Sequence, residues 1–314
     1  MGGRVPRAVA GLPDGPGVYR FRDGHGRVLY IGRATSLRSR VASYWSDLRD
    51  RGHLAPMVSR AARIEAVSCD SVHEAAWLER NLLEMSLPPW NRTPGGQEVL
   101  VYIRMDERAG EPGLSVQHVM RPASQVRYFG PYLGGLRVRQ AVAGLDRILP
   151  LAATGTRLRG ARLDMARARG VAGGDREGLA RAIAAVLGRR PAAVAGARAE
   201  LARLRDRAAE ALAFELAGRI QGELEALDWV VSPQRVTFGA GQAAGDLDVY
   251  GWSGDVLVHF GVRAGRLRLW VQRRCGWGRA QAHLAATPAE WAGFAGRNAE
   301  LAATLMRGRG DTAG

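Results

Sequence analysis

The alternation of apolar and polar positions predicts a β-hairpin near the start of the chain. Residues 18–21 and 28–31 are short runs rich in β-branched and aromatic residues, which favours strands. Residues 22–27 contain Asp-Gly and a second Gly, a composition typical of a hairpin turn. Side chains on facing strands stand close together, so Tyr19 and Tyr30 could face one small site. Tyrosine also simply suits half-buried strands, so this pair does not by itself define a function.

Helical periodicity follows the hairpin. A helix is predicted to begin near Ser36, and its buried side carries Leu37, Val41 and Tyr44. Arg33, Arg38 and Arg40 surround its start, so positive charge gathers beside the predicted hairpin.

A second helix is predicted over residues 71–87, and it ends at Pro88-Pro89 because proline cannot continue it. Glu79 falls within its apolar stripe, seven residues after Val72. A carboxylate on a buried face is costly unless it is paired or binds a metal ion. The alternative is a glutamate at the edge of the stripe that reaches solvent.

Taken in order, these segments resemble the GIY-YIG nuclease module at the front of the excinuclease subunit UvrC family. The segments that match are residues 12–19, 29–34 and 37–44, followed by Glu79, Asn91 and residues 102–104. The resemblance implies a small α+β nuclease module with an antiparallel sheet. It also implies hydrolysis of DNA phosphodiesters with Mg²⁺ or Mn²⁺.

The resemblance assigns a role to each site residue. Glu79 would hold the metal, and the catalytic set would comprise Tyr19, Tyr30, Arg33, Arg40, Tyr44, Glu79 and Asn91. Tyr19 would relay a proton from the attacking water, although an ordinary phenol with a pKa of about 10 is a poor base. Arg40 would clamp the scissile phosphate with its planar guanidinium. Tyr44 and Asn91 are equally compatible with structural roles.

The rest of the chain resembles further parts of the same family. The expected domains are a nuclease domain at 12–105, a connector at 106–195, a UVR-like helical hairpin at 196–232 and a C-terminal segment at 233–314. The last segment is predicted to form a small β meander with a turn at Gly265. A helix should follow, with Thr287 as N-cap in a capping box.

The predicted hairpin has its own charge balance. Residues 198–231 hold five Arg against seven Asp and Glu, whereas the whole chain has a net charge of +15. An acidic hairpin on a basic protein favours a protein partner, and the resemblance implies UvrB or a UvrB-like protein. Phe214, Leu216 and Ile220 would supply the apolar face that binds it. The alternative is an ordinary helix pair that closes on itself.

Composition favours a nucleic-acid partner. All 45 basic residues are Arg, and residues 1–64 carry twelve Arg against four Asp. That positive charge is where DNA phosphates would be met. Residues 151–195 add nine Arg against three acidic residues, compatible with a DNA-facing arm or with a solvated linker.

Cys69 and Cys275 are the only cysteines, which excludes a disulfide framework and predicts no iron–sulfur cluster. No apolar run is long enough to span a membrane and no signal peptide is recognised, so a cytoplasmic protein is expected. The expected function is a Mg²⁺-dependent endonuclease of the nucleotide-excision-repair type. It would act on damaged double-stranded DNA and make a single incision, 3′ of the lesion by analogy with the family. The alternative is a degenerate paralogue that binds DNA or UvrB without cutting, because residues 84–98 depart from the family pattern.

Overall fold

The computed structural model describes residues 7–46, 49–92, 99–168, 170, 174–233, 246–263 and 266–307. These residues form two compact units. Unit 1 combines the described residues up to 92 with residue 233 and those from 246 onward, and unit 2 holds those from 99 to 232. The C-terminal segment therefore belongs to the same compact unit as the N-terminal module.

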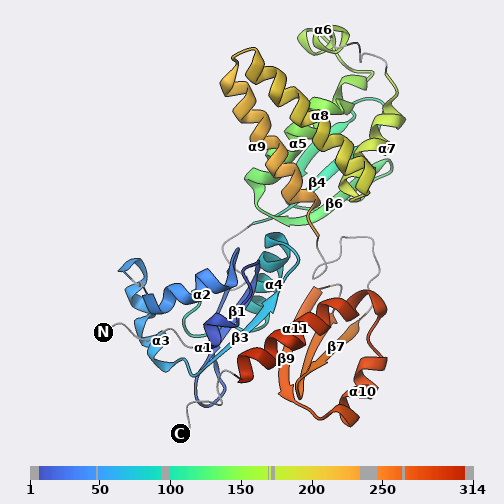
Figure 1. The fold of residues 1–314 in the computed structure, drawn as a ribbon. Helices are drawn as coiled ribbons and strands as arrows, with labels where there is room; N and C mark the ends of the chain where they lie inside the picture. The colour runs from blue at the N-terminus through green and yellow to red at the C-terminus, as the bar shows by residue number, and fades with distance from the viewer. Residues whose placement is uncertain are drawn as a thin grey trace. The chain divides into compact units, whose positions relative to one another are not determined.

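Unit 1 contains two three-stranded antiparallel sheets and the helices that cover them (Figure 1). Its elements are α1 Arg7–Ala10, β1 Gly17–Arg22, β2 Val28–Ala34, α2 Leu37–Ser46, the 3₁₀ helix η1 Arg49–Leu54, α3 Ala55–Arg60, β3 Arg63–Ser68, α4 Val72–Met85, β7 Leu247–Ser253, β8 Val256–Arg263, β9 Arg266–Arg274, α10 Trp277–Ala285 and α11 Ala289–Arg307.

The first sheet has the strand order β2-β1-β3, with Tyr19 opposite Gly32 on one side and opposite Ala66 on the other. The predicted hairpin is confirmed, since its two strands pair antiparallel. The two predicted helices are confirmed as α2 and α4. Ser71 caps α4, because its side chain accepts a hydrogen bond from the backbone N–H of Glu74.

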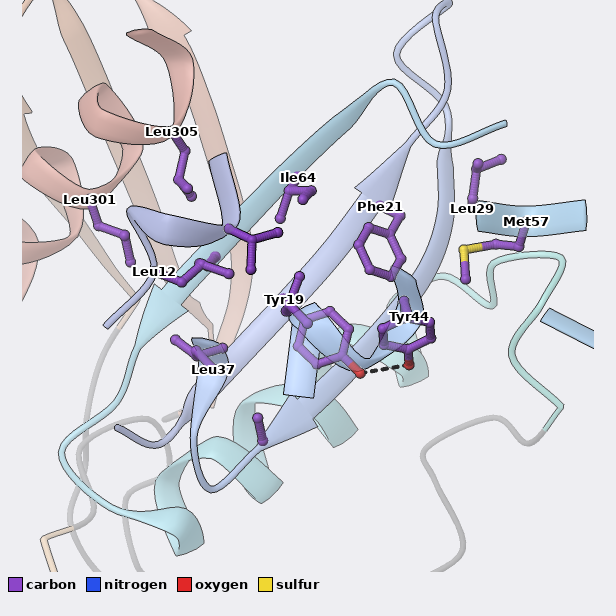
Figure 2. Packing of buried hydrophobic residues seen from close by; sticks show 14 of the residues in the cluster. Leu12, Tyr19, Phe21, Leu29, Leu37, Tyr44, Met57, Ile64, Leu301 and Leu305 are labelled. Carbon is purple, nitrogen blue, oxygen red and sulfur yellow. Dashed lines mark hydrogen bonds between the residues drawn. The ribbon is translucent and has the colours of Figure 1, made fainter. Parts of the chain in front are cut away.

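An apolar core fills the space between this sheet and α2. Aromatic rings occupy its centre, and Figure 2 shows Tyr19, Phe21 and Tyr44 packed beside one another. Leu301 and Leu305, from α11 at the other end of the chain, complete the same core.

The second sheet of unit 1 has the order β7-β8-β9, and the predicted meander is confirmed. Its expected turn residue, Gly265, lies outside the described residues. α11 packs on β7, β8 and β3 and so lies between the two sheets in contact with both (Figure 1). The helix begins at Ala289, and the hydroxyl of Thr287 hydrogen-bonds to the backbone N–H and C=O of Tyr250.

Unit 2 has one antiparallel sheet, in the order β5-β4-β6, and a set of helices. Its elements are β4 Leu100–Asp106, β5 Gly113–Gln117, β6 Val126–Leu133, α5 Gly135–Ile148, the 3₁₀ helix η2 Leu151–Thr154, α6 Ala161–Ala168, α7 Arg176–Leu187, α8 Pro191–Glu210 and α9 Phe214–Val231. Residues 102–104, which the resemblance places after the nuclease motifs, lie on β4 of this unit.

Helices α8 and α9 form the predicted hairpin, and both pack on α5. Arg147 of α5 donates two hydrogen bonds of 2.7 Å to the buried carboxylate of Glu223 on α9. A two-pronged pair of this kind fixes orientation as well as distance. One face of the hairpin is therefore used inside its own unit.

The observed fold class is α+β with small antiparallel sheets, as predicted. Both cysteines are buried and unpaired. A search of the described residues finds no helix with the length and apolar character needed to cross a membrane.

Candidate active site

Three tyrosines, from β1, β2 and α2, lie next to one another beside the β1–β2 hairpin. The hydroxyl groups of Tyr19 on β1 and Tyr44 on α2 are 2.8 Å apart and share a hydrogen bond (Figure 2). The ring of Tyr30 on β2 lies 6.2 Å from the rings of both. The fold thus brings together all three tyrosines that the sequence marks as candidates.

Burial keeps the hydroxyl groups of Tyr19 and Tyr30 protonated. Tyr19 is fully buried, and its desolvation, together with the neighbouring Tyr44 and Tyr30, raises its pKa well above the ordinary value. The pKa of Tyr30 is also raised, chiefly by burial and then by Tyr44. Both groups are therefore neutral phenols at neutral pH, suited to donating hydrogen bonds and not to acting as preformed phenolates.

Because the pKa of Tyr19 is raised in the folded protein, the free energy of unfolding depends on pH in the alkaline range. An unfolded tyrosine ionises near pH ~10, whereas the folded chain holds this proton to higher pH. The stabilisation is complete below pH ~10 and is lost as the pH rises toward the folded pKa. We expect Tyr19→Phe to lower the free energy of unfolding at pH 9 by about 1 kcal/mol. That deficit should shrink by pH 11 in urea unfolding curves, and an unchanged deficit would contradict the assignment.

Arg40 lies at the open side of the tyrosine cluster. Its side chain is exposed, and its guanidinium carbon is 5.8 Å from the centre of the Tyr44 ring. Although burial lowers the pKa of its guanidinium, the neighbouring Tyr19 raises it, and the net shift is upward. A planar cation held against two phenols, with its other edge toward solvent, is well placed to meet an incoming phosphate.

Glu79 of α4 faces β2 and pairs with Arg33. The distance from Arg33 Nε to a Glu79 carboxylate oxygen is 3.5 Å, and the glutamate side chain keeps 19% of its surface exposed. Glu79 is also close enough to Tyr30 to contribute to the raised pKa of that phenol. Both alternatives from the sequence are thus partly realised, because the carboxylate is largely covered and still reaches solvent.

The donor set at Glu79 suits a Mg²⁺ ion. Mg²⁺ commonly binds one or two carboxylates, keeps several waters and takes further oxygens from substrate phosphates. Glu79 offers one half-buried carboxylate with an open side, as such an ion needs. In the part of the chain that the structure describes, no group of three or more His, Cys, Asp or Glu forms a closed metal site.

Asn91 fixes the outer edge of β2. Its side-chain oxygen accepts from the backbone N–H of Ile31 at 2.9 Å, and its amide donates to the Ile31 carbonyl at 2.8 Å. It therefore satisfies the free backbone groups of an edge strand between Tyr30 and Gly32.

Asn298 of α11, to which the sequence assigned no role, performs the same task at the opposite edge. It accepts from the backbone N–H of Ser68 at 2.7 Å and donates to the Ser68 carbonyl at 3.2 Å. Asn298 lies far from Ser68 in the sequence, so no local sequence pattern predicts this contact.

Two glycines of the matched motifs, Gly17 and Gly32, are required by packing. A Cβ on Gly32 would stand 2.6 Å from the Tyr19 hydroxyl oxygen, and one on Gly17 would stand 2.2 Å from the Val67 carbonyl oxygen. Gly32 therefore makes room for the Tyr19 phenol, and Gly17 allows β1 to approach β3 closely.

The residues expected to bind a partner protein differ in exposure. Phe214 is 67% exposed and Leu216 38%, and both lie near the turn of the hairpin. Ile220 is only 2% exposed, which corrects its assignment to an exposed face. Only Leu216 and Ile220 have the i, i+4 spacing of one helix face, and the contact of α9 with α5 and α8 turns Ile220 inward.

This chain is similar to known proteins. The family model of the UvrC-like GIY-YIG domain matches residues 15–92. UvrABC system protein C of Mycobacterium sp. (strain KMS) is 34% identical over 290 residues, covering 83% of this chain and 40% of that protein. UvrABC system protein C of Geobacter metallireducens is 36% identical over 141 residues, covering 45% of this chain and 23% of that protein.

A solved structure is also similar. It is the GIY-YIG N-terminal endonuclease domain of UvrC from Thermotoga maritima, bound to its catalytic magnesium, with 29% identity over 29% of this chain and all of that chain. The TM-score is 0.26.

Residues 15–92 are thus a GIY-YIG domain of the UvrC-like class. The chain is a homologue of the UvrABC system C proteins along most of its length, and it spans about 40% of the length of the mycobacterial relatives.

Proposed function

We propose that this protein is a divalent-metal-dependent DNA endonuclease that acts in nucleotide excision repair. The observation that carries the proposal is the largely covered carboxylate of Glu79, which still reaches solvent and lies beside Arg33 and the tyrosine cluster on a UvrC-like GIY-YIG domain. The substrate would be damaged double-stranded DNA. By analogy with the family, the cut would fall on the 3′ side of the lesion.

Each residue of the site has its own role in this proposed reaction. Arg40 meets the scissile phosphate and offsets the charge that builds up during attack. Tyr19, kept neutral by burial, offers a hydrogen bond to a phosphate oxygen or to Tyr44. Asn91 holds β2 and therefore Tyr30 in position. Glu79 would hold a Mg²⁺ ion, which when bound would polarise the phosphate and lower the pKa of an attacking water.

A specific observation also supports the second candidate, a protein that binds DNA without cutting it. Glu79 is already paired with Arg33, and a metal ion would have to compete with that guanidinium. If the pair persists in the presence of Mg²⁺, the site lacks its metal and the domain becomes a binding module.

A nicking assay separates the two candidates. A lesion-bearing duplex, labelled on each strand, would be incubated with the protein in Mg²⁺, Mn²⁺ or EDTA, with and without a UvrB-like protein. We expect nicks that require the metal. DNA binding without nicking under every metal and partner condition would favour the binding module.

Recruitment through the hairpin gives a separate prediction. Phe214→Ala should weaken binding to a UvrB-like protein by about 10-fold or more, because an exposed aromatic anchor contributes strongly at an interface. The melting temperature should barely change, since Phe214 is 67% exposed. Leu136→Ala, at a 64% exposed position on α5, is the matched control and should bind as the wild type does. If calorimetry gives equal affinities for the wild type and both variants, the turn between α8 and α9 is not part of the interface.

A further inference from the structure

The outer face of the C-terminal sheet is distinct from the nuclease site. Gly251 of β7 faces α11, because a Cβ there would stand 2.0 Å from the Ala295 carbonyl oxygen. Side chains alternate along a strand, so Tyr250 and Trp252 lie on the opposite face. Cross-strand pairing places His259 and Leu257 of β8 beside them. This outer face is only partly covered, by α10 (Figure 1).

Trp277, the first residue of α10, is a preformed aromatic platform at one end of this face. It is 52% exposed, and its ring centre lies 5.0 Å from that of Trp252. Trp252 is itself fixed, because its indole N–H donates to the Cys275 carbonyl at 2.6 Å. Gly276 and Gly278 flank Trp277 and have open space where side chains would project. The exposed ring is thus held in place and unobstructed by its neighbours in the chain.

A second group of rings lies on the same face. Tyr250 stacks on His259 with ring centres 4.4 Å apart, and His283 of α10 lies 4.6 Å from the same tyrosine. His259 is oriented by Asp248, whose carboxylate oxygen is 2.8 Å from the ring nitrogen. Rings that brace one another in this way lose little freedom when a flat ligand stacks on them.

Positive charge predominates in this region. Residues 256–289 contain six Arg and neither Asp nor Glu. Arg263 pairs with Asp248, and Arg266 and Arg268 pair with Glu84. Arg273, Arg274 and Arg279 are exposed, and no ion pair with an acidic side chain is formed by them within the described residues. Arg273 stands opposite Leu257 and so lies on the outer face, whereas Arg274 stands opposite the buried Val256 on the other face of the sheet.

We propose that this face, formed by Trp277, the Tyr250–His259–His283 stack, Arg273 and Arg279, binds a single-stranded segment of DNA. Arginine side chains neutralise the phosphates, and exposed aromatic rings stack on bases. Bases inside a duplex are already stacked on one another, so an aromatic platform selects unpaired ones. The inference rests on the proposed function only for DNA as the substrate, and it adds a second contact surface on the unit that carries Glu79.

The test measures binding, and so does not depend on cleavage. Every protein would carry Glu79→Gln to prevent cutting, and binding to a labelled 12-nucleotide dT strand would be followed by fluorescence anisotropy. Trp277→Ala should weaken binding about 10-fold, and Trp277→Phe should recover most of it because a ring is restored. The double variant Arg273→Ala/Arg279→Ala should lower the slope of log K against log salt by about 1.4.

A matched control removes the same charge elsewhere. Arg207 and Arg219 are exposed positions of unit 2, and their double alanine variant should keep the salt slope and affinity nearly unchanged. The proposal is overturned if dT affinity stays within about twofold for both the Trp277 and the arginine variants while circular dichroism shows native folding. It is equally overturned if the double control variant loses as much dT affinity, if only duplex binding falls, or if the variants lose binding to a UvrB-like protein and keep binding to dT. Nicking of duplex by the protein with native Glu79 reports on the proposed function separately.

Discussion

Replacing Glu79 with Gln should reduce metal-dependent DNA cleavage by about 1,000-fold, because a neutral amide of the same size attracts Mg²⁺ far less strongly than a carboxylate. A loss of that size corresponds to roughly 4 kcal/mol of transition-state stabilisation. Affinity for duplex DNA should change little, since it arises from many Arg–phosphate contacts. Single-turnover nicking would measure the cleavage rate, and a parallel filter-binding experiment would measure the affinity for duplex DNA.

Glu84→Gln is the matched control for this experiment. Glu84 lies on the same helix, five residues further along, and its carboxylate pairs with Arg80, Arg266 and Arg268. Its loss removes one negative charge from α4 without touching the tyrosine cluster, so cleavage should stay within a few-fold of the wild type. If Glu79→Gln cuts as fast as Glu84→Gln, Glu79 does not hold the metal.

The parts of the nuclease module that local patterns encode could be predicted from sequence. The hairpin turn, the buried side of α2 and the end of α4 before Pro88 each depend on residues close together in the chain. The tyrosine cluster followed from the same patterns, because Tyr19 and Tyr30 lie on paired strands.

Non-local packing accounts for what the sequence could not provide. Leu301 and Leu305 of α11 enter the core of the nuclease sheet, and Asn298 satisfies the edge of β3. Trp270 of β9 lies under the guanidinium of Arg20 on β1, 3.8 Å from its ring centre. Each contact joins residues more than 200 positions apart, so no window along the sequence contains both partners. The same reason explains Ile220, whose burial depends on the docking of α9 against other helices.

Replacing Gly32 with Ala should damage both the fold and the site. The new Cβ would stand 2.6 Å from the Tyr19 hydroxyl oxygen, 2.7 Å from Cζ of the same ring and 2.8 Å from the Tyr30 ring. Tyr19 is fully buried and Tyr30 packs against the same core, so a ring or the strand has to move. Overpacking of this kind costs about 1–3 kcal/mol of unfolding free energy, measured by urea denaturation. Cleavage should fall by about 100-fold in addition, because a shift near 1 Å misplaces the groups that meet the phosphate.

Replacing Gly24, in the turn of the same β-hairpin, with Ala should have the opposite effect on stability from Gly32→Ala. Nothing lies within 4 Å of the position where its Cβ would project. Gly24→Ala should therefore leave cleavage unchanged and raise the free energy of unfolding by up to about 1 kcal/mol, since alanine restricts the unfolded chain more than glycine does. Two substitutions of identical chemistry in one hairpin would then have opposite signs. Equal effects of the two on stability would show that glycine at position 32 serves backbone freedom and not the space that the Tyr19 phenol occupies.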